Sequence, residues 1–599
     1  MSLTDRLEFD PNALREKYRE ERDKRLREDG PDQYIEIAGK WARYAEDDPY
    51  VEAGLTREPV VEDIDVAIVG GGFSGLLASA RLKEQGIEDF RIIEAGGDFG
   101  GTWYWNRYPG AQCDIESYCY LPLLEELNYM PKEKYSFAGE IFEHSQRIGQ
   151  HYGLYERTYF QTRVRSIDWD EATRRWRIST DRDDDIRARF VIMALGTASR
   201  AKLPGIPGID DFQGHSFHTS RWDYDYTGGN SEGGMTGLRD KSIAIIGTGA
   251  TAIQAVPRVA QYAKQLYVFQ RTPSSVDLRG NKPTDPEWWT SLQPGWQRQR
   301  RDNFGGILAG QDFEVDLVDD AWTDIFKHVM RAPKTDEPMT PQQMGELIEL
   351  ADFKKMNQIR ERVDVTVEDV ETAEALKPYY RQFCKRPTFN DEYLPCFNQE
   401  NVTLVDVSGE KGVERITASG VVANGEEYEV DCIIYATGFE ITTQFKRRLG
   451  LEINGRDGQS LFDYWAGGFK TLHGFSTRGF PNWFYIGVSQ NALSVNMTQM
   501  FDEQARHISY IIRETQRRGG TTVEPTEDAQ EKWVEVINSF TVLGAAFAES
   551  CTPGYYNNEG APRTAATGVY LPGINAFNRL LEDWREQGDM AGLEIDRPV

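Results

Sequence analysis

The fold is decided by the stretch Asp65-Val66-Ala67-Ile68-Val69-Gly70-Gly71-Gly72-Phe73-Ser74-Gly75. The short apolar run before the glycines is typical of a buried parallel strand. Glycines spaced as G-x-G-x-x-G after such a strand permit a tight turn and let backbone N–H groups approach a pyrophosphate. A helical stretch, 76–85, and a second strand, 90–93, complete a βαβ unit. The stretch therefore predicts a dinucleotide-binding α/β domain.

Glu94 stands at the end of the second strand of this unit. A carboxylate at that point can accept hydrogen bonds from the hydroxyls of a bound ribose. The alternative is a tight strand-to-helix turn that binds nothing. The glycines, the strand, the helix and Glu94 together favour a nucleotide site.

A second glycine loop, Gly247-Thr248-Gly249-Ala250-Thr251-Ala252, follows the apolar run 242–246. The next strand ends in Gln270-Arg271-Thr272 instead of an acid. An acid would repel a 2′-phosphate, whereas Arg271 and Thr272 could hold one by charge and hydrogen bonding. The alternative is that Arg271 is an ordinary surface arginine. Two loops of this kind predict an oxidoreductase that binds two nucleotides, most simply FAD and NADPH.

Composition excludes several classes of protein. The net charge of −28 argues against nucleic acid and anionic membrane surfaces as partners, although local arginines can still hold a nucleotide. We find no apolar run long enough to span a membrane and no apolar signal core near the N-terminus, so we expect a cytoplasmic enzyme. The scattered cysteines and histidines lack ligand spacing, which predicts no metal site and no dithiol centre. The sequence leaves the oligomeric state open.

The predicted fold class is α/β, with two Rossmann-like dinucleotide-binding domains for FAD and NADPH, a helical insert and an N-terminal extension. The expected boundaries are 1–60 for the extension, 61–195 for the first part of the FAD domain, 196–284 for the first part of the NADP domain, 285–380 for the helical insert, 381–430 for the second part of the NADP domain, and 431–599 for the second part of the FAD domain with the C-terminal segment.

Between the two loops lies Phe212-Gln213-Gly214-His215-Ser216-Phe217-His218-Thr219-Ser220-Arg221-Trp222-Asp223. Its Phe212, Gly214, His218, Trp222 and Asp223 match the F-x-G-x-x-x-H-x-x-x-W-D fingerprint of the type I Baeyer–Villiger monooxygenases. The chain resembles that family. The segment 100–114 also resembles the family's flavin-contacting segment, and Lys385-Arg386 resembles its catalytic Lys-Arg pair. In the family the fingerprint is thought to couple domain motion to cofactor handling, so His218 need not transfer a proton; the alternative is that it only packs a linker.

The resemblance implies two sets of cofactor contacts. For FAD they are Gly70, Gly72, Phe73, Ser74, Gly75, Glu94, Gly101, Thr102, Trp103, Asp114 and Tyr120. For NADP they are Gly247, Thr248, Gly249, Ala250, Thr251, Ala252, Arg271, Thr272 and Lys385.

The resemblance also implies a reaction. NADPH would reduce FAD, O2 would form a C4a-peroxyflavin, and a ketone would become an ester or lactone. Arg386 would stabilise the anionic oxygen because its guanidinium keeps its proton, and Asp114 would hold Arg386 in place. The alternatives are a surface ion pair for Arg386 and a loop cap for Asp114.

One segment departs from the family pattern. Many members carry a Ser-Trp-Tyr-type segment near the C-terminus, whereas the corresponding stretch here, 552–560, contains no Trp. Together with the extension, this resembles the cyclopentadecanone and steroid branch, which implies large cyclic, long-chain or steroidal ketones. The stretch 493–497 is a candidate for pocket lining, although a Met there could equally belong to the core.

Three other functional interpretations compete with ketone oxygenation. A flavin monooxygenase that acts on amines or sulfides is opposed by Trp222-Asp223 and by Arg386. A flavin disulfide reductase is disfavoured because no suitably spaced cysteine pair follows the first glycine loop. A catalytically silent nucleotide sensor is the third alternative; unlike the enzyme, it would not consume NADPH when a ketone is added.

Overall fold

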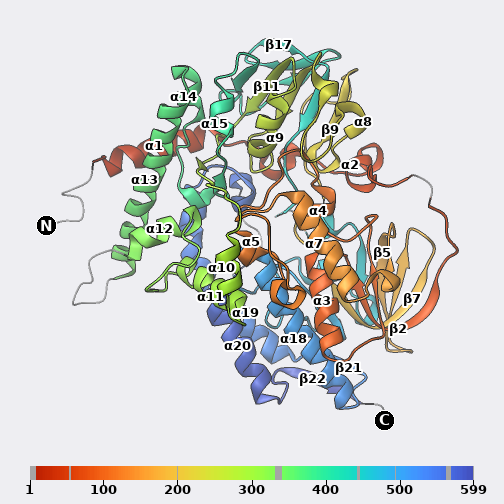
Figure 1. The fold of residues 1–599 in the computed structure, drawn as a ribbon. Helices are drawn as coiled ribbons and strands as arrows, with labels where there is room; N and C mark the ends of the chain where they lie inside the picture. Colours follow the sequence, from red (N-terminus) through yellow and green to blue (C-terminus); the bar gives the residue numbers. More distant parts are fainter. Residues whose placement is uncertain are drawn as a thin grey trace.

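A computed structural model describes residues 8–52, 55–198, 200–330, 340–441, 445–492, 494–561 and 568–597. Two sheets with parallel cores dominate it, and helices pack against both (Figure 1). The predicted α/β class with two Rossmann-like units is therefore confirmed.

The first sheet is built around β2, the strand before the first glycine loop. Its eight strands are β2 (Val61–Val69), β3 (Phe90–Ile93), β4 (Thr158–Tyr159), β5 (Val164–Asp170), β6 (Arg175–Thr180), β7 (Asp185–Met193), β19 (Glu452–Asn454) and β20 (Trp483–Tyr485). Strand β2 runs parallel to β3 and β7. Val66 and Ile68 face one core with helix α3 (Phe73–Glu84), whereas Ala67 and Val69 face another. Burial on both faces explains why residues 66–69 of this strand are apolar without alternation.

The second sheet repeats this plan around β10. Its strand order is β14-β11-β10-β18-β9, and all four pairings are parallel. The strands are β9 (His215–His218), β10 (Ser242–Ile246), β11 (Gln265–Gln270), β14 (Val402–Asp406) and β18 (Cys432–Tyr435), and helix α9 (Ala252–Ala260) follows the second glycine loop. Strand β18 belongs to this second sheet, whereas the expected boundary at 430/431 assigns it to the FAD domain. We propose moving it to the turn at 436–438.

The chain crosses between the two sheets at two places that touch each other. One crossing follows β7 and the other follows β18. Lys202 N donates to Gly438 O at 2.9 Å, Thr437 Oγ1 donates to Lys202 O at 2.5 Å, and Ala201 bridges Phe439. The second sheet is thus inserted into the chain of the first through a paired connection.

Helices fill the chain between β12 (Val276–Asp277) and β13 (Thr388–Phe389). They are α10 (Pro286–Ser291), α11 (Trp296–Leu308), α12 (Ala321–Met330), α13 (Pro341–Thr366) and α14 (Val370–Leu376). Thr340 and Gln343 form a capping box at the start of α13, which fixes where that helix begins.

The N-terminal segment lies against both the helices and the second nucleotide unit. Helix α1 (Pro11–Arg25) begins with Asp10 capping its first turn, and it packs against α13 (Figure 1). Arg15 pairs with Glu349. Strand β1 (Tyr34–Ile35) then pairs with β8 (Leu203–Pro204) next to the paired connection.

The C-terminal part returns to both units. Helix α18 (Met497–Arg517) packs on α3, and α19 (Glu527–Ser550) leads to the short helical loop η8 (Tyr555–Gly560). A disulfide joins Cys384 to Cys551 across 167 residues, with a Cα–Cα distance of 5.1 Å. Within the described residues, no helix is long and apolar enough to cross a membrane.

Candidate active site

One large cavity of about 870 Å³ is lined by both glycine loops. Most of the residues predicted to contact cofactor line it. From the FAD set these are Gly70, Gly72, Phe73, Ser74, Glu94, Gly101, Thr102, Trp103, Asp114 and Tyr120. From the NADP set and the catalytic pair they are Gly247, Thr248, Gly249, Ala250, Thr251, Arg271, Thr272, Lys385 and Arg386.

Gly75 and Ala252 are the predicted contacts that do not line this cavity. A Cβ at Gly75 would overlap the carbonyl oxygen of Gly70, so this glycine lets α3 pack closely on its strand. Ala252 is fully buried. Both residues therefore serve the packing of helix on sheet, which is the usual role of the third position in such loops.

The first glycine loop has the shape of a phosphate cradle. Gly70 has a φ of 112°, and a Cβ there would lie 2.5 Å from Ala194 O. Glycine adopts this positive φ without steric strain, whereas a residue with a Cβ does not. Helix α3 begins at Phe73 without a side-chain cap, so its first N–H groups are available to an anion. The loop fits the pyrophosphate of FAD.

Glu94 braces this loop from the end of β3. Its carboxylate accepts hydrogen bonds from Gly71 N at 2.5 Å and from Gly96 N at 2.6 Å. Burial raises the pKa of Glu94, and the two N–H groups offset part of that rise. Glu94 thus holds the glycine loop, a role beyond the ribose contacts predicted for it.

The second glycine loop has nearly the same geometry. Gly247 also has a φ of 112°, and a Cβ there would lie 2.5 Å from Ala436 O. Helix α9 likewise begins without a side-chain cap. Thr248 Oγ1 donates to Thr272 O at 2.8 Å, which ties the loop to the segment that follows β11.

Cations gather beyond the end of β11. Arg271 donates to Gln33 Oε1 at 2.5 Å and pairs with Glu559 at 3.1 Å. Burial, and then the charge of Arg271, lower the pKa of Lys385 to about 8. Thr272 Oγ1 is buried and has no hydrogen-bond partner among the described residues. A cationic pocket with an unsatisfied hydroxyl fits a 2′-phosphate.

Four of the groups around this pocket were missed by sequence reasoning. They are Gln33, Tyr34, Lys202 and Glu559, and all of them line the cavity. They come from the N-terminal segment, the paired connection and the C-terminal loop. Two of them had a nearby signal: Lys202 follows the strand-to-glycine junction at 190–197, and Glu559 lies in the stretch 552–560 that departs from the family pattern.

Arg386 and Asp114 form a bidentate pair in the cavity. Arg386 Nε lies 2.7 Å from Asp114 Oδ2, and its second nitrogen lies 2.8 Å from Oδ1. Burial would raise the pKa of Asp114, but the Arg386 guanidinium outweighs it and the pKa is lowered. Trp322 donates to Asp114 O at 2.8 Å, and its ring lies 5.3 Å from the guanidinium carbon. The arginine remains 28% exposed, so one side of it is open to the cavity.

The fingerprint residues lie behind the cavity wall, at the edge of the second sheet. Trp222 and His218 are fully buried, and Trp222 Nε1 donates to Thr227 Oγ1 at 3.1 Å. Asp223 caps helix α8 (Tyr224–Thr227) through Tyr226 N and accepts from His215. Burial lowers the pKa of His218 to about 3, so the ring is neutral at ordinary pH. Of this segment Arg221 lines the cavity, stacked 3.8 Å from the ring of Trp105.

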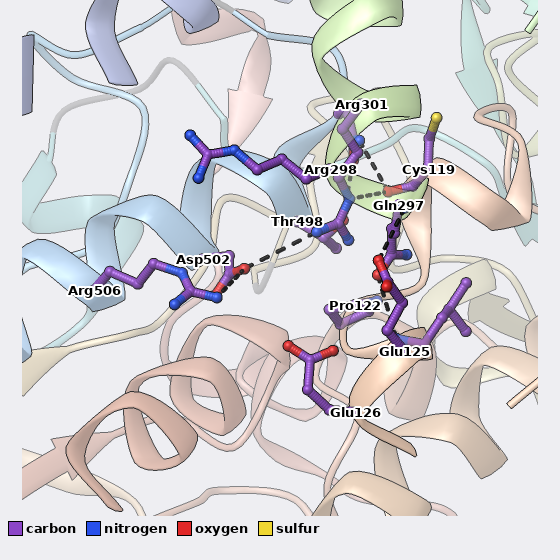
Figure 2. Close-up of polar contacts among 12 residues, drawn as sticks. Cys119, Pro122, Glu125, Glu126, Gln297, Arg298, Arg301, Thr498, Asp502 and Arg506 are labelled. Atoms are coloured by element: carbon purple, nitrogen blue, oxygen red, sulfur yellow. Dashed lines mark hydrogen bonds and ion pairs between the residues drawn. The ribbon is translucent and has the colours of Figure 1, made fainter. Parts of the chain in front are cut away.

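A second, highly charged cavity of about 780 Å³ lies on the other side of the segment that carries Tyr120. Figure 2 shows Arg301 and Gln297 of α11 reaching this segment. Arg301 donates to Cys119 O at 2.8 Å, and Gln297 donates to Leu121 O at 2.7 Å. Thr498 Oγ1 donates to Tyr120 O from α18. On the cavity side, Trp103 Nε1 donates to the Tyr120 hydroxyl at 2.9 Å. This network holds Tyr120 in place from behind.

Comparison with known proteins gives consistent matches. Residues 67–294 match the family model described as pyridine nucleotide-disulphide oxidoreductase. Neopentalenolactone D synthase of Streptomyces avermitilis is 50% identical, with 98% of this chain and 99% of that protein covered. Baeyer-Villiger monooxygenase ATR8 of Stachybotrys chlorohalonatus is 49% identical, with 98% and 95% covered.

Solved structures agree with these relatives. The polycyclic ketone monooxygenase from Thermothelomyces thermophila superposes with a TM-score of 0.91 at 38% identity, covering 98% of this chain and 99% of that one. An oxidized steroid monooxygenase bound to NADP has a TM-score of 0.73 at 29% identity, with 90% and 100% covered. The chain therefore belongs to the Baeyer–Villiger monooxygenases, flavoprotein oxidoreductases that use FAD and NADPH to convert ketones to esters or lactones.

Proposed function

We propose that Arg386 and Asp114 are the catalytic pair of this enzyme and that one atom of O2 is inserted beside the carbonyl of a large ketone. The observation that carries this proposal is the bidentate Arg386–Asp114 contact in a cavity lined by both glycine loops. An arginine that is paired on one side and open on the other can meet a second anion.

The first glycine loop, Glu94, and the segment from Gly101 to Trp103 would hold FAD, with Asp114 and Tyr120 nearby. Bound FAD supplies hydride acceptance from NADPH and the activation of O2. The chain's own contribution is a dry, fixed electrostatic environment. Arg386 keeps its charge because the pKa of its guanidinium is raised, which burial opposes and Asp114 outweighs. It would stabilise negative charge that develops on the carbonyl oxygen of the ketone.

Arg271, Thr272 and Lys385 would hold the 2′-phosphate of NADPH. The proposal is supported by the cationic pocket beyond β11 and by the unsatisfied Thr272 hydroxyl.

The proposed domains are an FAD unit of 61–195 and 437–599, an NADP unit of 196–284 and 381–436, and the helical insert 285–380. We place the enzyme in the cytoplasm.

A large substrate is supported by the likeness to the structure named polycyclic ketone monooxygenase. Apolar and aromatic side chains line the same cavity as Arg386, among them Val495, Met497, Phe501 and Tyr555. Leu493, the first residue of the stretch named for pocket lining, lies outside the described residues.

The test is a ketone panel that spans small rings, macrocycles, long chains and steroids. NADPH oxidation is followed and each product is identified by its mass. We expect ester formation with the large ketones and at least tenfold lower rates with cyclohexanone-sized rings. Equal rates across the panel would remove the size proposal.

The catalytic role is tested with Arg386→Ala. We expect this variant to retain FAD and its reduction by NADPH, while ester formation falls by about 100- to 1000-fold, as for the loss of a transition-state charge partner. The matched control is Arg57→Ala, which removes a bidentate pair to Asp184 of similar exposure that does not line the cavity. Normal ester yield from Arg386→Ala would overturn the assignment.

A further inference from the structure

Glu559 lies among the cations that the proposed function assigns to the coenzyme. It belongs to η8, and its side chain is only 4% exposed. Its Oε2 lies 3.1 Å from Arg271, and its Oε1 lies 3.2 Å from Lys202 Nζ. The Tyr34 hydroxyl donates to Oε1 at 3.2 Å. The Glu559 carboxylate therefore lies between Arg271 and Lys202 at the wall of the main cavity.

The electrostatics show that this carboxylate is bound as an anion. Burial would raise the pKa of Glu559, but Arg271, Lys202 and Lys385 together hold it below its ordinary value. Burial and the charge of Arg271 lower the pKa of Lys385, and the nearby charge of Glu559 opposes this shift. Three cations therefore face one carboxylate, and the pocket retains capacity for a more highly charged anion.

We propose that Glu559 is a coenzyme-selectivity residue that occupies the cations of the phosphate pocket until a 2′-phosphate replaces it. This inference rests on the proposed phosphate site. A phosphate monoester carries about −1.5 to −2 charges at neutral pH and can therefore outcompete a single carboxylate. NADH carries no 2′-phosphate and leaves the Glu559 contacts in place.

The position of Glu559 connects this exchange to the cavity wall. Its loop begins at Cys551, which is joined by the disulfide to Cys384, the neighbour of Lys385. Tyr555 of the same loop lines the main cavity, and Gly554 lies against Lys385. If Glu559 is released, the end of this loop loses its contacts to Arg271 and Lys202, while its start at Cys551 stays joined to Cys384. NADPH, and not NADH, would then alter the cavity wall.

The test measures binding of two fragments, adenosine 2′,5′-bisphosphate and adenosine 5′-diphosphate, to the full-length FAD-loaded enzyme by calorimetry. Glu559→Gln keeps the shape of the side chain and removes its charge. We expect this variant to bind the 2′-phosphorylated fragment about tenfold or more tightly, because the competing charge is gone, with unchanged binding of adenosine 5′-diphosphate. Glu410→Gln is the control, since Glu410 lines the same cavity and is not among the groups that contact Glu559 or the three cations. We expect it to bind both fragments like the parent enzyme.

Tyr34→Phe provides a second measurement that leaves the charge of the pocket unchanged. It removes one hydrogen bond that retains Glu559, so we expect the 2′-phosphorylated fragment to bind about two- to fivefold more tightly. Unchanged or weaker binding in both Glu559→Gln and Tyr34→Phe would overturn the inference and show that Glu559 supports the pocket.

Arg271→Ala separates this inference from the proposed function. If Arg271→Ala fails to weaken binding of the 2′-phosphorylated fragment, the phosphate site itself is wrong. If it weakens that binding while Glu559→Gln does not tighten it, the site stands and only the role of Glu559 fails.

Discussion

The two glycine loops of this enzyme are nearly the same backbone built twice. Gly70 and Gly247 share a φ of 112°, and each faces a carbonyl of the neighbouring parallel strand at the same 2.5 Å from a would-be Cβ. Each loop is followed by a helix without a side-chain cap. The similarity fits a turn that recognises what the two nucleotides share, which is the pyrophosphate.

The loops differ at the end of the strand that follows. The first strand ends in Glu94, which turns back to hold its own glycine loop, and the second ends in Arg271, which turns outward into a cationic pocket. We propose that the acid in one loop and the base at the equivalent position of the other separate the two nucleotides.

The largest effect is expected when the turns themselves are broken. Gly70→Val should give a colourless protein that loses bound flavin, because the new side chain would collide with Ala194 O in a conformation that valine avoids. Gly247→Val should leave the protein yellow and abolish NADP⁺ binding. Flavin absorbance and NADP⁺ calorimetry distinguish the two. A yellow Gly70→Val protein would contradict the assignment of the loops.

The next largest effect is expected from removing the cation that distinguishes the second loop. Arg271→Ala should raise the KM for NADPH by about 10- to 100-fold, equivalent to about 1.5–3 kcal/mol for a hydrogen bond to a charged group. The KM for NADH should change little. Steady-state kinetics with both coenzymes measure the ratio, and an unchanged preference would remove the 2′-phosphate argument.

A smaller effect is expected from pH. The pKa of Lys385 is lowered to about 8 by burial and by Arg271, so the free enzyme loses this proton as pH rises through 8. A phosphate binds the protonated form, and the phosphate itself is already a dianion there. NADP⁺ affinity should therefore be highest between the phosphate pKa of about 6 and pH 8, and fall by up to about tenfold per unit above pH 8. NAD⁺ binding should stay flat, and Lys385→Met should abolish the slope.

The smallest effect is expected at Glu94. Glu94→Gln keeps one acceptor for the glycine loop and loses the charge, so we expect FAD to dissociate about three- to tenfold faster, with NADP⁺ binding unchanged. Flavin release in dilute solution measures the rate. An equal effect on both cofactors would show that Glu94 acts on the whole fold and not on its own loop.

Local patterns in the sequence were enough to find both cradles, since a strand, a glycine turn and a helix are neighbours along the chain. Arg386 and Asp114 are 272 residues apart, and they were paired only through the family resemblance. Gln33 and Tyr34 carry no pattern that marks them, because each acquires its role from segments that meet only in the folded chain. The Cys384–Cys551 disulfide has no motif for the same reason.

The shift that we propose for the boundary at 430/431 has a similar cause. Strands β7 and β18 are both short apolar runs that end in a glycine turn, and sequence alone does not say which sheet each joins. Pairing of Ile433 with Ala244 decides it for β18. Register in parallel sheets is set by distant partners, which local periodicity does not reveal.

The chain enters and leaves the second nucleotide unit through two backbone segments that are hydrogen-bonded to each other. The unit is therefore one continuous insertion in the chain of the first sheet. Such an insertion can be exchanged between relatives as one continuous stretch of coding sequence without cutting the host fold elsewhere. Grafting a homologous 198–438 segment onto this host would therefore exchange the second nucleotide unit, the helices of 285–380 and Arg386 together in one step.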